Sequence, residues 1–151
     1  MPIVKVTDLA YARLQSPSLD DAERFLTDFG MVRAERTRDA LYMRGTDAPH
    51  HVHVTHVGPS KFIGLAFAVA SDDELRLFAK APGASAVEHL DEPGGGLRVR
   101  ITDPNGYQIE VVYGLQALAP GVFANTYRSS SLGTENARPM NFDGPRCVTW
   151  M

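Results

Sequence analysis

The sequence predicts an α+β fold in which one unit, a strand, a helix and then three strands, occurs twice. Three observations support this prediction. Two helix-like stretches begin in the same way, apolar residues in alternation indicate strands around each of them, and the units repeat after about 50 residues. A repeat is stronger evidence than either half alone. We therefore expect modules at about 5–58 and 61–114, within one domain that covers residues 1–114.

The two expected helices share a start signal. Ser18 is followed three residues later by Asp21, and Ser71 is followed three residues later by Glu74. A serine three residues ahead of an acid is typical of a helix N-terminus, where the hydroxyl accepts a backbone hydrogen bond. Apolar residues then recur at helical spacing. They are Leu19, Ala22, Phe25, Leu26 and Phe29 in the first helix, and Leu75, Phe78 and Ala79 in the second.

Strands are expected on both sides of each helix, because apolar and polar residues alternate there. In the first half they cover residues 9–15, 31–37, 40–44 and 51–57. In the second half they cover residues 62–70, 86–90, 97–102 and 107–113.

The last of these strands carries an unusual carboxylate. A turn formed by residues 103–106, Asp-Pro-Asn-Gly, leads into it. Glu110 then stands in the middle of an otherwise strongly apolar segment. A buried carboxylate requires a metal, a cation or water. The alternative is a strand whose polar face meets solvent.

Composition limits the function classes. The chain has 151 residues, 44% hydrophobic and 22% charged, with a net charge of −3 and no basic cluster, which argues against a nucleic-acid partner. Cys147 is the single cysteine and indicates a reducing compartment. We find no signal peptide and no run long enough to span a membrane. We therefore expect a cytoplasmic protein without a membrane partner.

The character of the sequence changes after Gly114. Residues 115–151 are rich in glycine, proline and serine, and they show no sustained period. So long an irregular stretch is unusual inside a compact domain. We interpret it as an irregular C-terminal arm that serves as a linker, wraps a partner or is disordered.

Residues 5–114, with the turn at 103–106 ahead of Glu110, resemble the vicinal oxygen chelate superfamily. This group includes glyoxalase I, bleomycin-resistance proteins and extradiol ring-cleaving dioxygenases. The resemblance implies that the two modules lie side by side, so that eight strands curl into a cup around a divalent metal. It also implies a homodimer.

Extradiol dioxygenases are the most similar group. Residues 41–44, followed by the double histidine His50-His51, resemble the strand pattern of their catalytic module. The resemblance implies that His51 is the catalytic acid/base histidine. Those enzymes have two modular domains, of which the N-terminal one carries no metal. The arm at 115–151 is similar to the linker between them, so this chain also resembles a non-catalytic first half.

The metal ligands that the resemblance implies are two histidines and a glutamate on three facing strands. Tyr11 and Gly64 stand at the two histidine positions, and Glu110 alone matches. His51 and His53 are two residues apart, the spacing of a local chelating pair. One interpretation is therefore an atypical metal site, in which these two histidines and Glu110 hold Fe(II) or Mn(II). The alternative is a cup that holds no metal, with the histidines on the polar face of their strand.

The resemblance also implies a small aromatic ligand. The candidate residues for binding it are Tyr11, Arg44 and Tyr113. Tyr11 is alternatively a wall residue of the cup whose hydroxyl binds a neighbour.

Three functions follow from these observations. The first is a dioxygenase-like protein that oxygenates a small aromatic diol with a metal. The second is a metal-free small-molecule binding protein, similar to bleomycin-resistance proteins. The third is the non-catalytic structural half of a two-module dioxygenase.

Overall fold

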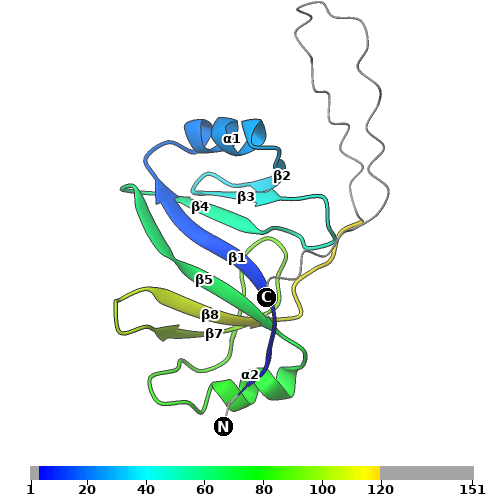
Figure 1. The fold of residues 1–151 in the computed structure, drawn as a ribbon, viewed down its shortest axis with the longest axis vertical. Helices are drawn as coiled ribbons and strands as arrows, with labels where there is room; N and C mark the ends of the chain where they lie inside the picture. Colours follow the sequence, from blue (N-terminus) through cyan, green and yellow to red (C-terminus); the bar gives the residue numbers. More distant parts are fainter. Residues whose placement is uncertain (1–3, 120–151) are drawn as a thin grey trace, which may run out of the picture.

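The computed structural model describes residues 4–119, which form eight strands and two helices (Figure 1). The first module contains β1 (Val6–Ser16), α1 (Leu19–Asp28), β2 (Val32–Arg36), β3 (Ala40–Arg44) and β4 (His53–Val57). The second contains β5 (Lys61–Val69), α2 (Asp72–Phe78), β6 (Glu88–His89), β7 (Leu97–Thr102) and β8 (Gln108–Tyr113).

The strands form one curled mixed sheet in the order β2-β3-β4-β1-β5-β8-β7-β6. β1 and β5 are antiparallel neighbours at its centre, and each is parallel to the last strand of its own module, β4 or β8. In Figure 1, α1 lies above β2, β3 and β4, and α2 lies at the opposite end beside β7 and β8. The sheet is open, and the predicted α+β fold with two βαβββ modules is confirmed. No helix within residues 4–119 is long and apolar enough to cross a membrane.

Strand register assigns the side chains to two faces. One row across the sheet runs through Met43, His53, Ala12, Leu65 and Ile109. Met43 packs against α1, so this row lies on the helix side. A row on the opposite, inner face runs through Tyr11, Ala66 and Glu110.

Both helix starts agree with the sequence analysis. The hydroxyl of Ser18 accepts from the backbone N–H of Asp21, and that of Ser71 accepts from Glu74, each at 3.2 Å. Strand boundaries differ more. The expected strand 86–90 is reduced to two residues in β6. The backbone N–H of Leu90 still donates to the carbonyl of Gly96, and the three glycines with positive φ, at 94–96, form the connection into β7.

The expected strand 51–57 begins two residues later, at His53. The backbone N–H of His50 instead donates to the carbonyl of Gln116 at 3.2 Å, in a segment we call the strap, residues 115–119. The strap is part of the yellow segment in Figure 1. Its Gln116 N–H donates to Gly94 of the second module, and its Leu118 N–H donates to Ala48 of the first. The beginning of the expected arm therefore joins the two modules. Residues 120–151 lie outside the described part of the chain.

Candidate functional site

The centre of the inner face is the carboxylate of Glu110, whose side chain is only 2% exposed. The hydroxyl of Tyr11 donates to its Oε2 at 2.5 Å. The Nε of Arg13 lies 3.0 Å from its Oε1, in an ion pair too bent for a hydrogen bond, and an Nη of Arg13 donates to Oε2 at 3.3 Å. The amide of Gln108 donates to Oε1, and Arg98 lies 3.6 Å from it. Glu110 is therefore fully surrounded by donors.

The small side chains of β5 make this arrangement possible. The strand β5 lies between β1 and β8. On it, Gly64 is the partner of Arg13, and Ala66 is the partner of Tyr11. Neither β5 residue has a long side chain, so the two β1 side chains reach across β5 to Glu110. A Cβ on Gly64 would come within 1.7 Å of the carbonyl oxygen of Gln108, so glycine is required there. The small residues of β5 thus leave the space over the central strand that Tyr11 and Arg13 need to reach Glu110.

Arg13 connects Glu110 to two more side chains. It is 5% exposed, and its Nη1 lies 2.6 Å from Nε2 of His56, a hydrogen bond that the imidazole accepts as the neutral ring. Its Nη2 donates to Oε2 of Glu92 at 3.0 Å. Arg98 approaches the other oxygen of Glu92 at 3.5 Å. Two arginines and two glutamates therefore balance each other's charge inside the cup.

This balance sets the protonation states. Burial alone would raise the pKa of Glu110, but the charge of Arg13, the hydrogen bond from Tyr11 and the charge of Arg98 together hold that pKa below its ordinary value. Burial alone would lower the pKa of the Arg13 guanidinium. The nearby Glu110, Tyr11 and Glu92 outweigh this effect, so that pKa is raised. Burial and the nearby carboxylate of Glu110 raise the pKa of Tyr11. The pair therefore stays ionised, and Tyr11 stays a neutral donor.

His51, the expected acid/base residue, lies beside this network and is 3% exposed. Its ring centroid is 4.9 Å from that of Tyr11 and 5.2 Å from that of Tyr42. Its Nδ1 lies 2.9 Å from Nδ1 of His50, and its Nε2 has no hydrogen-bond partner within residues 4–119. Burial, followed by the charges of His50 and Arg13, lowers the pKa of His51 to about 4. The ring is therefore neutral at pH 7 and is a poor proton donor there.

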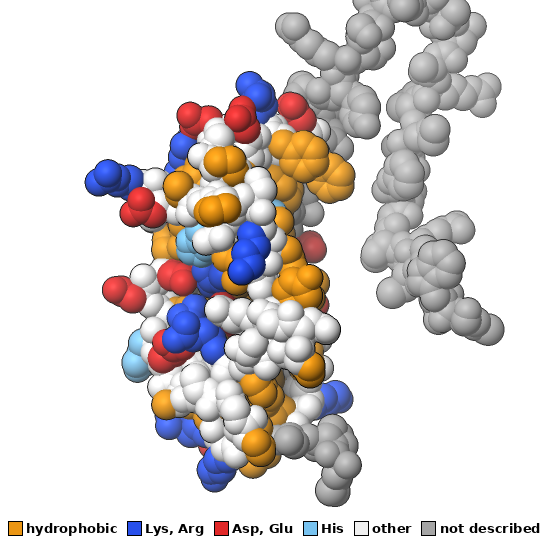
Figure 2. Space-filling model, turned by 90° about the vertical axis from the view of Figure 1, so that its left-hand side faces the viewer, with side chains coloured by type: hydrophobic (Ala, Val, Ile, Leu, Met, Phe, Trp, Pro, Cys, Tyr) orange, Lys and Arg blue, Asp and Glu red, His pale blue; other side chains and the backbone are white. Residues whose placement is uncertain are grey.

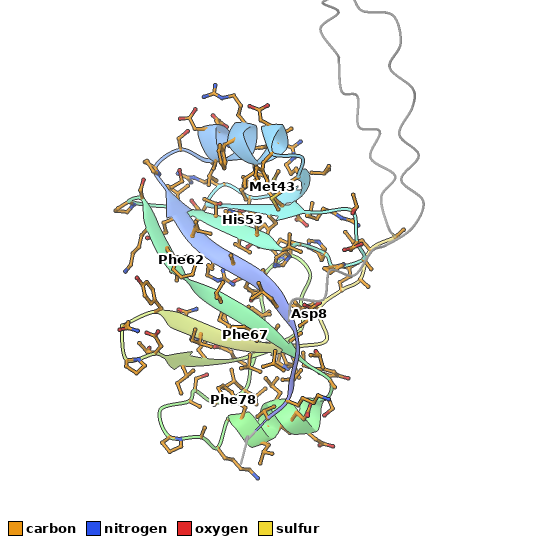
Figure 3. All side chains as sticks on the ribbon, in the orientation of Figure 1. Asp8, Met43, His53, Phe62, Phe67 and Phe78 are labelled. Carbon is orange, nitrogen blue, oxygen red and sulfur yellow. The ribbon has the colours of Figure 1, made fainter. Side chains whose placement is uncertain are left out.

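His53 does not join Glu110. It is the first residue of β4 and lies on the helix side of the sheet, on a strand next to the one that carries Met43 (Figure 3). Its Nε2 bonds to Thr55 at 2.8 Å. Residues 4–119 contain no group of three histidine, cysteine, aspartate or glutamate side chains placed to hold a metal. With Glu110 already paired to Arg13, the residues as they stand do not fit the Fe(II) or Mn(II) site that the resemblance implies.

The other two candidate residues also lie away from Glu110. Arg44 is buried and donates to the carbonyl oxygens of Asp47 and Ala119, at 2.8 and 3.0 Å, so it holds the strap. Tyr113 is half-buried, packs against the cluster beneath α2 and borders a pocket of about 340 Å³. That pocket lies between β1, the ends of β5 and β8, and the strap. Its lining includes Asp8, Ala10, Ala68, Val112, Leu115 and Gln116.

Sequence reasoning did not assign the partners of Glu110. It recognised that a buried carboxylate needs a metal, a cation or water, and the cation is Arg13. The signal was present, because Arg13 follows Tyr11 by two residues and therefore shares its face on β1. Gln108 carried the same signal, because it precedes Glu110 by two residues on β8 and therefore shares its face. His56 and Glu92 carried no comparable signal, because their approach depends on how β4 and the loop after β6 curl around β1.

Solved structures show where this fold occurs. A Mn(II)-bound glyoxalase from Novosphingobium aromaticivorans matches with a TM-score of 0.71 at 23% identity, over 80% of this chain and 43% of that chain. Homoprotocatechuate 2,3-dioxygenase from Brevibacterium fuscum, in an anaerobic complex with 3,4-dihydroxyphenylacetate, matches with a TM-score of 0.66 at 22% identity, over 79% of this chain and 41% of that chain. The dioxygenase from Arthrobacter globiformis matches with a TM-score of 0.65 at 25% identity, over 79% and 40%.

The chain thus spans less than half the length of each of these proteins. No protein-family model matches the sequence, and no curated protein matches it. The chain therefore has the fold of these glyoxalase and dioxygenase structures, as the sequence resemblance implied.

Proposed function

We propose that this chain is the metal-free, non-catalytic module of a dioxygenase-like vicinal oxygen chelate protein, and that it supports a catalytic module elsewhere. The carrying observation is the ion pair of Arg13 with Glu110. A guanidinium stands beside the one carboxylate that matches the metal-binding pattern, so the charge that a metal would supply is already present.

Further contacts support this proposal. Every nitrogen of Arg13 approaches an acceptor at 3.3 Å or less, and its side chain is 6% exposed, so solvent ions have little access to the pair. The matched proteins are more than twice as long as the part that this chain covers, which leaves room in them for a second, catalytic domain.

Metal content tests the proposal directly. The full chain would be purified without chelator, analysed for metals, and titrated anaerobically with Fe(II) and with Mn(II). We expect far less than one metal per chain and no oxygen uptake with simple catechols. One tightly held metal per chain that disappears in Glu110→Gln would overturn the proposal.

The competing function, metal-dependent oxygenation of a small aromatic diol, requires Glu110, His51 and His53 to act together. In the described structure His53 faces the helix side, and Glu110 is bound to Arg13. Oxygen uptake with a catechol that is lost in both Glu110→Gln and His53→Ala would favour this function over the proposed one.

Binding of a small aromatic ligand is the second candidate, and the 340 Å³ pocket beside the strap favours it. Its volume is at the lower end of the range for ligand sites, and its lining is mainly aliphatic. Phenol titrated against isotope-labelled protein should shift the NMR signals of Ala68 and Val112. Ala68→Phe, which adds a ring at a partly exposed position of the lining, should abolish the shift at Val112. Chelator should have no effect.

We further propose that the module forms a homodimer in the cytoplasm, in line with the single cysteine. Hydrophobic side chains are exposed along the right-hand edge of Figure 2. The structure exposes Leu9 and Phe62 on the central strands at 52% and 40%, and Phe25 and Phe29 on α1 at 68% and 78%. Light scattering should give twice the chain mass, and Phe62→Ser should shift the equilibrium towards the monomer if the central strands form the contact.

A further inference from the structure

We propose that Arg13 occupies a latent divalent-metal site made by His56, Glu92 and Glu110, and that removing its side chain opens this site. The inference rests on the proposed metal-free function of the wild-type chain. It differs from the expected metal site in its ligands, because it uses neither His51 nor His53.

The donors already converge on one cation. His56 Nε2 lies 2.6 Å from Nη1 of Arg13, Glu92 Oε2 lies 3.0 Å from Nη2, and Glu110 Oε1 lies 3.0 Å from Nε. The three donors come from three separate parts of the fold: β4, the loop after β6, and β8. Imidazole nitrogen and carboxylate oxygen together form a donor set suited to Mn(II), Zn(II) or Fe(II).

The guanidinium keeps these donors apart. It is a planar group that spreads its charge over three nitrogens, so each donor meets a different atom at 2.6 to 3.0 Å. A metal ion would bind the same donors at about 2.0 to 2.2 Å from one point. This difference explains why the described residues form no metal group while Arg13 is in place.

Charge supplies the driving force. Without Arg13, the buried carboxylate of Glu110 and that of Glu92 would face the single guanidinium of Arg98, at 3.6 and 3.5 Å. Two carboxylates and one arginine leave a net negative centre, in which the side chain of Glu110 is 2% exposed and that of Glu92 is 24% exposed. The buried carboxylate in such a centre favours binding of a cation over remaining unpaired.

Arg13→Ala is the test. The full chain would be titrated with Mn(II), with the loss of the free-ion EPR signal and the calorimetric heat as readouts. We expect no binding by the wild type, and about one Mn(II) per chain for Arg13→Ala, reduced at least tenfold in affinity by the double change Arg13→Ala/Glu110→Gln. Mn(II) should also raise the melting temperature of Arg13→Ala and leave that of the wild type unchanged.

Arg98→Ala is the matched control. It removes an arginine that contacts the same two carboxylates but not His56, and it leaves Arg13 in place, so it should bind no Mn(II). If Arg13→Ala does not fold alone, refolding with and without Mn(II) replaces the titration, and the proposal expects folding only with the metal. An Arg13→Ala chain that stays metal-free, or stays unfolded with Mn(II), would overturn the latent site and leave the metal-free function standing. Stoichiometric binding by the wild type would instead overturn the metal-free function.

Discussion

The two modules have the same order of elements but contribute opposite charges to the inner face. The first module supplies the cation Arg13 from β1. The second supplies the anions Glu92 and Glu110 with the single cation Arg98, so its share of the network is net negative. Their central strands differ in the same way. Opposite Tyr11 and Arg13 on β1, the strand β5 carries only Ala66 and Gly64. The repeat in topology is therefore not a repeat in chemistry, and neither module balances its own buried charge.

The first way to break this comparison is to remove the cation. Arg13→Ala in metal-free buffer should lower the free energy of unfolding by about 3 to 5 kcal/mol, because it leaves Glu110 buried without its main partner. Arg13→Met/Glu110→Gln should lose less than that single change, because no unpaired charge remains and Tyr11 keeps an acceptor. Urea unfolding followed by circular dichroism measures both. A double variant as unstable as the sum of the two single variants would show that the charges act independently.

A second test uses the pH dependence of the first module. The pKa of His51 is about 4 in the folded protein against an ordinary 6.5, so the unfolded chain takes up the proton first as the pH falls. The contribution of neutral His51 to the free energy of unfolding is therefore complete above pH 6.5. It declines by on the order of 3 kcal/mol as the pH falls to about 4.

His51→Phe keeps a ring between Tyr11 and Tyr42 but does not titrate. Its unfolding free energy should therefore fall less than that of the wild type between pH 8 and pH 5. Burial also lowers the pKa values of His50, His53 and His56, so a smaller slope should persist in the variant. Parallel curves for variant and wild type would contradict the neutral, buried state of His51.

The third test concerns the small residues of β5. Gly64→Ala should lower the unfolding free energy by about 2 kcal/mol or more, because the new Cβ meets the Gln108 carbonyl oxygen and forces β5 from β8. Gly45→Ala is the control, since a Cβ there has nothing within 4 Å and the backbone needs no positive φ. We expect it to change stability by no more than about 0.5 kcal/mol. Equal changes in unfolding free energy for the two variants would mean that the sheet can shift to accommodate a Cβ at Gly64.

The fold was largely predictable because its signals are local. Ser18 and Ser71 mark the helix starts, and the alternation around each helix marks the strands that the sheet contains. The short β6 was harder to predict, because Glu88 and His89 are all that pair before the glycines redirect the chain.

The partners of the site were less predictable than the site itself. Glu110 stands out in an apolar strand, and its need for a cation follows from burial alone. Whether a metal or Arg13 meets that need depends on rotamers and strand curl, which the alternation of residues does not encode. His51 shows the same limit, since it lies just before β4, where strand alternation no longer fixes the direction of a side chain.

The smallest effect sharpens the comparison at the helix starts. Ser18→Ala and Ser71→Ala should each lower the unfolding free energy by about 1 kcal/mol, because each removes the side-chain acceptor for one backbone N–H.

The second helix has an additional contact: the carboxylate of Glu74 accepts from the N–H of Ala70 at 3.0 Å, whereas Asp21 binds Arg24 on the surface. Glu74→Ala should therefore destabilise the protein more than Asp21→Ala, by a few tenths of a kcal/mol or more, since an exposed ion pair contributes little. The same urea measurements compare these variants. Equal losses would mean that the two helix starts are equivalent in energy, and that the modules differ only in the charges they contribute to the cup.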